Sequence, residues 1–131
     1  MDIFIISRDG SKQSVMANLA TAMALKQQGL EVTLAYVQEA MVAVAENKFQ
    51  YRGLLESYQD SIEKTINDMG FPTDPIVLLK MAREAGVEII TCPIWAAVAG
   101  TKNKLPSEIK VVELKELFQV IARSKKILGQ F

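Results

Sequence analysis

Few residues of this sequence could do covalent chemistry. The chain contains one cysteine, Cys92, and no histidine, so Ser–His–Asp and Cys–His arrangements are excluded. A lone cysteine forms no internal disulfide, and without histidine the usual ligand sets of structural zinc and iron–sulfur sites are missing. The catalytic candidate is therefore the Cys92 thiolate acting without a histidine, and we expect neither a metal nor an organic cofactor.

Cys92 stands in the segment EIITCPIWAAVAG, residues 88–100. An apolar strand ends at Cys92, and Pro93 fits the first position of a short helix, where a missing amide hydrogen costs nothing. If Cys92 caps this helix, the amides of Ile94 and Trp95 can face the sulfur and favour its thiolate form. The alternative is a buried cysteine that behaves as a small inert hydrophobe. Trp95 is then a core or interface aromatic rather than the wall of a sulfur-binding pocket.

A second candidate site is the loop SRDGSKQS, residues 7–14, which follows a strand and opens a helix. Backbone amides at the helix start, together with Ser7, Gly10, Ser11 and Lys12, could bind an anion. The match to a phosphate loop is weak because there is one glycine and no Gly-Lys-Ser ending. The alternative is an ordinary turn capped by Asp9 or Ser11.

Strands and helices alternate along the chain, which predicts parallel strands joined by right-handed crossovers. Apolar patterns predict strands over 2–7, 31–37, 87–92 and 109–114. They predict helices over 12–28, 39–48 and 75–85, the last with Asp74 as its N-cap. A final helix is predicted from the helical spacing of Leu114, Leu117, Phe118, Ile121 and Leu128.

The expected fold class is therefore α/β. We expect one domain, residues 1–131, built as a three-layer α/β/α sandwich with a mostly parallel sheet of four or five strands. Ligands of such sheets lie beyond the carboxyl ends of the strands. The loops after the first two strands, near Ser7 and Tyr36, should therefore converge with Cys92.

Residues 47–73 break the alternation and look like a helical insertion. From about Leu54, apolar residues fall three or four apart, which predicts an amphipathic helix. The residues of this stripe are Leu55, Tyr58, Ile62, Ile66 and Met69. The stripe must be covered by its own domain, by another subunit or by closing over a cleft, and the sequence leaves these alternatives open.

Charge and hydropathy limit the partners. Fifteen basic side chains balance fifteen acidic ones, and half of the residues are hydrophobic. This composition is typical of a soluble globular protein. Because the net charge is zero, no overall electrostatic field attracts the chain to nucleic acid or to a membrane surface. No apolar run approaches the ~20 residues of a membrane span. Together with the lone cysteine, this predicts a cytoplasmic protein without nucleic-acid partners.

The segment LLKMAREAGVEIITCPIWAAVAG resembles the cysteine segment of the DsrE/DsrF-like (DsrEFH) sulfur-relay family. Members of this family share four features: a helix ending in Ala-Gly, a Val-rich strand, a Cys, and a Gly about eight residues after it. The opening strand, the first helix and VVELKELFQVI are also similar, so the resemblance covers most of the chain except 47–73. It implies a small cytoplasmic α/β/α protein that forms a trimer or hexamer. In members with the cysteine, matched here by Cys92, it also implies transfer of sulfane sulfur as a persulfide.

The resulting hypothesis is a sulfurtransferase-like carrier. The Cys92 thiolate attacks the outer sulfur of a donor persulfide and becomes a persulfide itself. Amides at the start of the helix stabilise the developing negative charge, and an acceptor thiolate then takes the terminal sulfur. Donor and acceptor are expected to be other proteins, because a single cysteine has no internal resolving partner. The bulky residues 93–95 and the insertion depart from the family. The alternatives are a non-catalytic oligomeric subunit or binding module with a structural Cys92, and a redox sensor that oxidises at Cys92.

Overall fold

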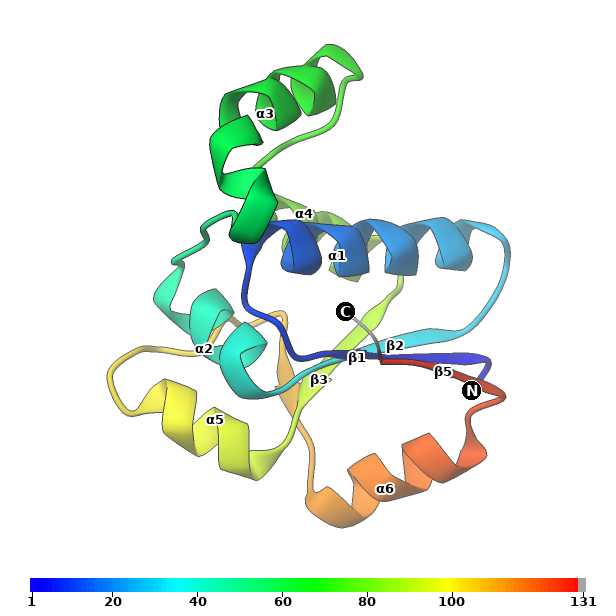
Figure 1. Cartoon of the computed structure of the whole chain (residues 1–131). Helices are drawn as coiled ribbons and strands as arrows, with labels where there is room; N and C mark the ends of the chain where they lie inside the picture. Colours follow the sequence, from blue (N-terminus) through cyan, green and yellow to red (C-terminus); the bar gives the residue numbers. More distant parts are fainter. Residues whose placement is uncertain (130–131) are drawn as a thin grey trace.

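The computed structural model describes residues 1–129, which fold around a five-stranded sheet (Figure 1). All strands are parallel and lie in the order β4-β3-β2-β1-β5. Their bounds are β1 (Ile3–Ser7), β2 (Val32–Tyr36), β3 (Glu88–Thr91), β4 (Lys110–Val111) and β5 (Lys126–Leu128). The predicted parallel sheet is confirmed, with five strands rather than four.

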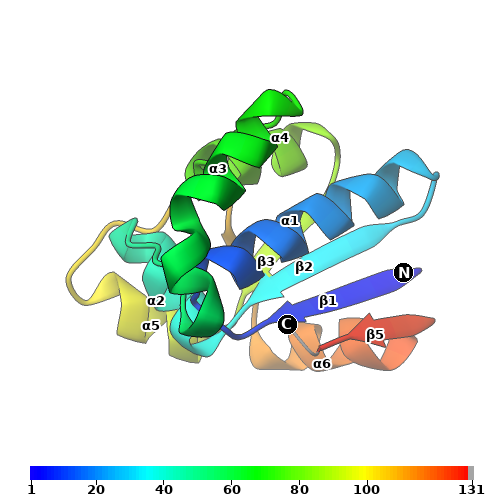
Figure 2. The same cartoon turned by 45° about the horizontal axis from the view of Figure 1, so that its top comes forward.

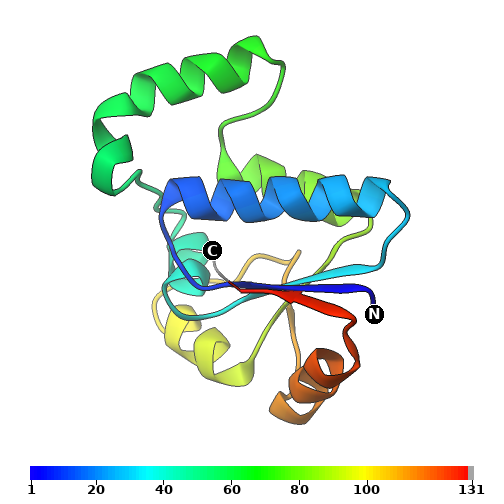
Figure 3. The ribbon, with the colours of Figure 1, turned by 45° about the vertical axis from the view of Figure 1, so that its right-hand side comes forward.

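Helices cover both faces of the sheet, and the predicted α/β/α sandwich is confirmed. The helices are α1 (Lys12–Gln27), α2 (Gln38–Glu46), the 3-10 helix η1 (Gly53–Tyr58), α3 (Gln59–Asp68), α4 (Pro75–Glu84), α5 (Pro93–Gly100) and α6 (Leu114–Arg123). Figures 1 and 3 show α1 and α4 on one face and α5 and α6 on the other. Helix α2 packs beside α5 at the end of the sheet where the strands finish.

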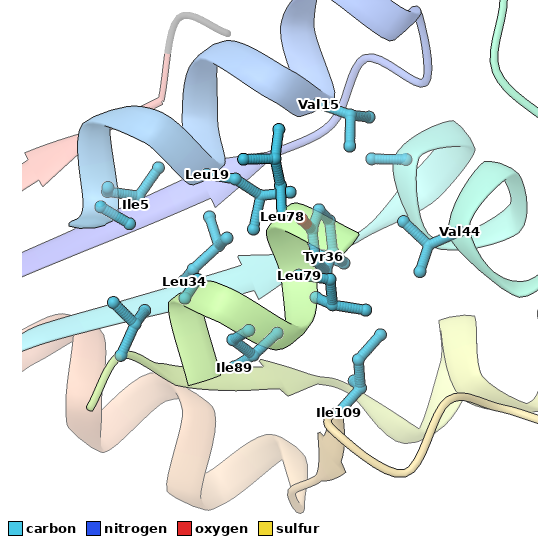
Figure 4. Close-up of a cluster of buried hydrophobic side chains, with 14 of the residues drawn as sticks. Ile5, Val15, Leu19, Leu34, Tyr36, Val44, Leu78, Leu79, Ile89 and Ile109 are labelled. Carbon is cyan, nitrogen blue, oxygen red and sulfur yellow. The ribbon is translucent and has the colours of Figure 1, made fainter. Parts of the chain in front are cut away.

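Side chains alternate along each strand, so the sheet supports two hydrophobic cores. The larger core lies under α1 and α4 and includes Ile5, Leu34, Ile89, Leu19 and Leu79 (Figure 4). The smaller core lies on the opposite face and contains Phe4, Ala35, Ile90, Cys92, Val112 and Leu117. Burial on both faces explains why the strands read as nearly continuous apolar runs.

Helix ends follow the expected local chemistry. The hydroxyl of Ser11 accepts a hydrogen bond from the amide of Ser14 at the start of α1, and Gly29 adopts φ +87° just beyond its end. Asp74 caps α4 through the amide of Ile76, and Pro75 occupies the first helical position. These caps satisfy amides that have no partner inside the helix.

The carboxyl-terminal part differs from the sequence prediction. Helix α6 ends at Arg123, and Leu128 lies in β5, which pairs with the edge of β1. Placing Leu128 on the helix was wrong, because backbone pairing along β1 takes precedence over an apolar residue that happens to match helical spacing. The strand predicted over 109–114 is shorter, since Leu114 already belongs to α6.

Residues 53–69, comprising η1 and α3, form an arm that stands away from the rest of the protein on the α1 and α4 side (Figures 1 and 2). The helix predicted from Leu54 starts as a 3-10 turn and becomes α-helical at Gln59. Neither η1 nor α3 contains a buried residue. At its base the arm is held by an ion pair between Lys12 and Glu63 and follows Tyr51, which is buried.

Across residues 1–129, the helices lack the combination of length and apolarity that a membrane span requires.

Candidate functional site

The carboxyl ends of β1, β2 and β3 meet at one edge, as predicted. Ser7 pairs with Tyr36 in register, and the hydroxyl of Thr91 donates a 2.7 Å hydrogen bond to the carbonyl of Tyr36. Side-chain alternation nevertheless separates the candidate residues. Tyr36 belongs to the larger core and Cys92 to the smaller one. The sheet therefore lies between the cysteine and the polar side chains that were expected to join it.

Cys92 is 4% exposed and packs among apolar side chains of the smaller core. Its backbone caps α5, since its carbonyl accepts the amide of Ala96 at 3.0 Å. Within residues 1–129, no amide makes a capping hydrogen bond to its side chain, so the expected contact with the amides of Ile94 and Trp95 is not made. The geometry matches the alternative interpretation of a cysteine that fills core space.

The two residues that follow Pro93 have different surroundings. Ile94 is 54% exposed and extends from the outer side of α5. Trp95 is half-buried and packs against both cores at the end of the sheet. The indole therefore joins the two cores next to Cys92 and contributes apolar area there, as expected for a core aromatic.

In the loop between β1 and α1, the place expected for a bound anion is taken by the carboxylate of Asp9. The Asp9 carboxylate accepts hydrogen bonds from the Ser11 amide at 2.8 Å and the Ser14 hydroxyl at 3.1 Å. Burial raises the pKa of Asp9, but these hydrogen bonds and the charge of Arg52 outweigh it, and the pKa falls below its ordinary value. The start of α1 is thus capped by Asp9 and Ser11, as the alternative interpretation of this loop predicted.

Gly10 is required by close packing rather than by a ligand. A Cβ atom on Gly10 would stand 2.8 Å from both the Cγ atom and the backbone oxygen of Glu39. Arg52, at the base of the arm, forms ion pairs with Glu39 and, at 3.7 Å, with Asp9. These ion pairs link the loop to α2 and to the segment that precedes the arm. Sequence reasoning missed both Glu39 and Arg52, because nothing in their local patterns links positions so far apart.

A small polar group lies inside the larger core. The Nδ2 atom of Asn18 donates to the hydroxyl of Ser7 at 2.8 Å, and both residues are fully buried. In the described part of the chain, Asn18 Oδ1 and the Tyr36 hydroxyl have no hydrogen-bond partner. Burial raises the pKa of Tyr36, which keeps its hydroxyl protonated. An isolated asparagine on the inner face of α1 was the sequence signal for this group, and it was overlooked.

The surface carries large apolar areas. On α5, the outward residues Pro93, Ile94, Ala97 and Val98 are all exposed. On the arm, Leu54 is 89% and Tyr58 60% exposed. Between the arm, α1 and α4 lies an apolar groove of about 480 Å³, lined by Met16, Met23, Ile66, Phe71, Leu78 and Met81 among others. Of the stripe predicted on the insertion, Ile66 packs against the larger core, whereas Leu55, Tyr58 and Met69 are exposed.

Over residues 1–129, no group of three or more His, Cys, Asp or Glu side chains is arranged to hold a metal ion. At the loop, the two carboxylates Asp9 and Glu39 instead share one cation, the guanidinium of Arg52.

Comparison with known proteins identifies the fold. No family model and no curated protein matches the chain by sequence. Among solved structures, the YchN protein from E. coli is similar, with a TM-score of 0.69 and 18% sequence identity over 98% of each chain. At this identity the likeness concerns the fold alone, and this chain shares the α/β/α architecture of YchN over nearly its whole length.

Proposed function

We propose that this chain is a non-catalytic subunit of a homo-oligomer, in which Cys92 is structural and the arm presents a functional surface. The observation that carries the proposal is a contrast in exposure. Cys92 is 4% exposed, whereas Tyr58 on the arm is 60% exposed. The cysteine is buried in the core, whereas the apolar side chains of the arm, which a stable monomer would bury, are exposed to solvent.

The surroundings of Cys92 support a structural role. Its side-chain neighbours in the smaller core, including Phe4, Ile90 and Leu117, are apolar. Exchange with a protein-bound persulfide requires direct access to the sulfur, and the burial of Cys92 denies that access. Free cysteine in such a place acts as a small hydrophobe.

The extent of the surface supports association. The chain exposes 7539 Å², while a compact monomer of 14.5 kDa is expected to expose about 6,900 Å². Exposed apolar side chains such as those of α5 and the arm mark interaction sites in soluble proteins when they form a large patch. The sequence resemblance to the DsrE/DsrF-like family is consistent with this proposal, since it implies a trimer or hexamer.

Sulfur transfer is the second candidate function, and the place of Cys92 favours it. Cys92 lies at the carboxyl end of β3, directly before the first turn of α5, at the edge where parallel sheets bind ligands. In this reaction the Cys92 thiolate attacks the outer sulfur of a donor R–S–SH, forming Cys92–S–SH and releasing R–S⁻. Because the side chain is buried, the start of α5 must move away before the donor sulfur can reach it.

Two measurements test the proposal. Sedimentation equilibrium of the full chain is expected to give an oligomer, and a monomer at all concentrations would contradict the proposal. Intact mass after incubation with glutathione persulfide is expected to be unchanged in the native protein. A gain of one sulfur that disappears on reduction and is absent from Cys92→Ser would establish sulfur transfer instead. Chain unfolded in urea serves as the positive control for thiol reactivity.

A further inference from the structure

The arm is positioned firmly but is not covered. Lys12, at the start of α1, forms an ion pair with Glu63 on α3 and lies 5.4 Å from the ring centroid of Tyr51. The backbone of Arg52 exchanges two hydrogen bonds with the side chain of Gln13. These contacts fix where the arm leaves the domain. Ile66 of α3 packs against the larger core but is only half-buried, and neither η1 nor α3 contains a buried residue. So short a helix is marginal in water without more tertiary packing.

Helix α5 has a second uncovered surface. Its sequence, PIWAAVAG, contains no charged or hydrogen-bonding side chain except the indole of Trp95. Ala96 and Ala99 face inward and are buried, while Ile94 and Val98 are exposed by 54% and 52%. A helix that is apolar on all sides is normally buried on all sides.

Charge selects which surfaces meet. Residues 53–69 carry four acidic side chains and one basic one. The segment from 93 to 107, which contains α5 and the loop after it, carries Lys102 and Lys104 and no acidic side chain. The arm and the α5 surface are therefore complementary, whereas two arms placed together would bring like charges into contact.

A contact between the arm and α5 would cover both exposed surfaces. Pairing arm with arm would leave α5 exposed, and pairing α5 with α5 would leave the arm exposed. The arm lies on the opposite side of the sheet from α5 (Figures 1 and 3), so the arm of a chain does not cover its own α5. A contact between copies remains.

We infer that the arm of one copy covers the outward face of α5 in a second copy, with Tyr58 and Leu54 packing against Ile94 and Val98. This inference rests on the proposed oligomeric subunit and specifies its interface. The contact is heterologous, because each copy offers its arm to one neighbour and its α5 to another, and such contacts close into rings when the rotation allows. It would also enclose the edge that contains Cys92.

The experiment compares Tyr58→Asp and Val98→Asp by sedimentation in the full chain. Each variant is expected to weaken assembly at least tenfold, because each places a carboxylate in the apolar contact. Phe118→Asp changes a residue of α6 that is also 60% exposed, and it is expected to assemble as the native chain does. Far-ultraviolet circular dichroism confirms that each variant is folded.

Mixing the two defective variants tests the direction of the contact. Tyr58→Asp retains an intact α5 and Val98→Asp an intact arm, so an equimolar mixture is expected to form a one-to-one dimer that neither variant forms alone. A native chain that is monomeric contradicts the proposed function itself. A native oligomer that persists in both variants, or a mixture without dimers, overturns the arm contact and leaves the oligomeric subunit in place.

Discussion

The edge around Cys92 and the arm are opposites in composition and exposure. The edge contains the one cysteine of the chain, yet its sulfur-bearing side chain lies in an apolar core and its neighbouring loop is closed by the ion pairs of Arg52. The arm contains no residue type with obvious chemistry, yet it exposes a row of large apolar side chains. The presence of a reactive residue type in the sequence thus did not indicate which side chains folding leaves exposed.

The difference follows from how each region is stabilised. The edge gains its stability from burial within the protomer, where each square ångström of apolar surface removed from water contributes roughly 25 cal/mol. The arm is attached mainly by one half-buried ion pair, a few hydrogen bonds and the partial packing of Ile66, so burial within the chain stabilises it little. Changes in the two regions should therefore affect different measurements.

The largest effect is expected from Cys92→Asp. The carboxylate would lie unpaired in the smaller core, and the free energy of unfolding should fall by about 3–5 kcal/mol. Urea denaturation at a concentration where the chain is monomeric measures this change. Leu54→Asp is the matched control on the arm, and its effect should stay within about 0.5 kcal/mol. Equal losses in the two variants would remove the contrast between the regions.

A smaller effect is expected from Cys92→Ser, which is close in size but places a hydroxyl in the core. Leaving that hydroxyl without a partner should cost about 1–3 kcal/mol. Cys92→Ala should cost less, because it leaves a small cavity and no unpaired polar group. Thermal unfolding of the three proteins gives the ranking. If Cys92→Ser proves as stable as the native chain, the site is accessible to water and sulfur transfer becomes the better proposal.

Glu63→Gln should change the arm while sparing the core. The ion pair with Lys12 is half-buried, so the loss in protomer stability should be about 0.2–1 kcal/mol. Amide hydrogen exchange in 59–68 should accelerate while exchange in β1 stays unchanged, because the arm alone loses its anchor. Asp68→Asn, which breaks the exposed pair with Lys64, is the control. Equal acceleration by both changes would show that Glu63 is not the anchor.

The smallest effect concerns the dependence of stability on pH. The pKa of Asp9 is lower in the folded chain than its ordinary value. Its contribution is therefore complete above the unfolded pKa of about 3.9 and is lost as the pH falls through the folded pKa. Asp9→Asn should lose less stability than the native chain between pH 5 and pH 2, as measured by urea denaturation at each pH. A native chain that loses no more stability than Asp9→Asn over this range would contradict the prediction.

Much of the fold could be predicted because it depends on local signals. Apolar runs of β-branched residues marked β1, β2 and β3, the Asp74–Pro75 pair marked the start of α4, and Gly29 marked the end of α1. Alternation of these elements is enough to predict a parallel sheet between helix layers. The prediction did not hold for Leu128, whose place depends on pairing with the edge of β1 rather than on its own neighbours in sequence.

The candidate site was predicted less well, because burial and direction are properties of the packed chain. The sequence by itself determined that Cys92 ends a strand and starts α5, that Gly10 sits in a turn, and that the arm has an apolar stripe. Only the tertiary structure decided that Cys92 faces the core opposite Ser7, that Arg52 pairs with Asp9, and that part of the stripe is left exposed. The physical reason is that local backbone preferences act between near neighbours in sequence, whereas side-chain contacts join segments that only folding brings together.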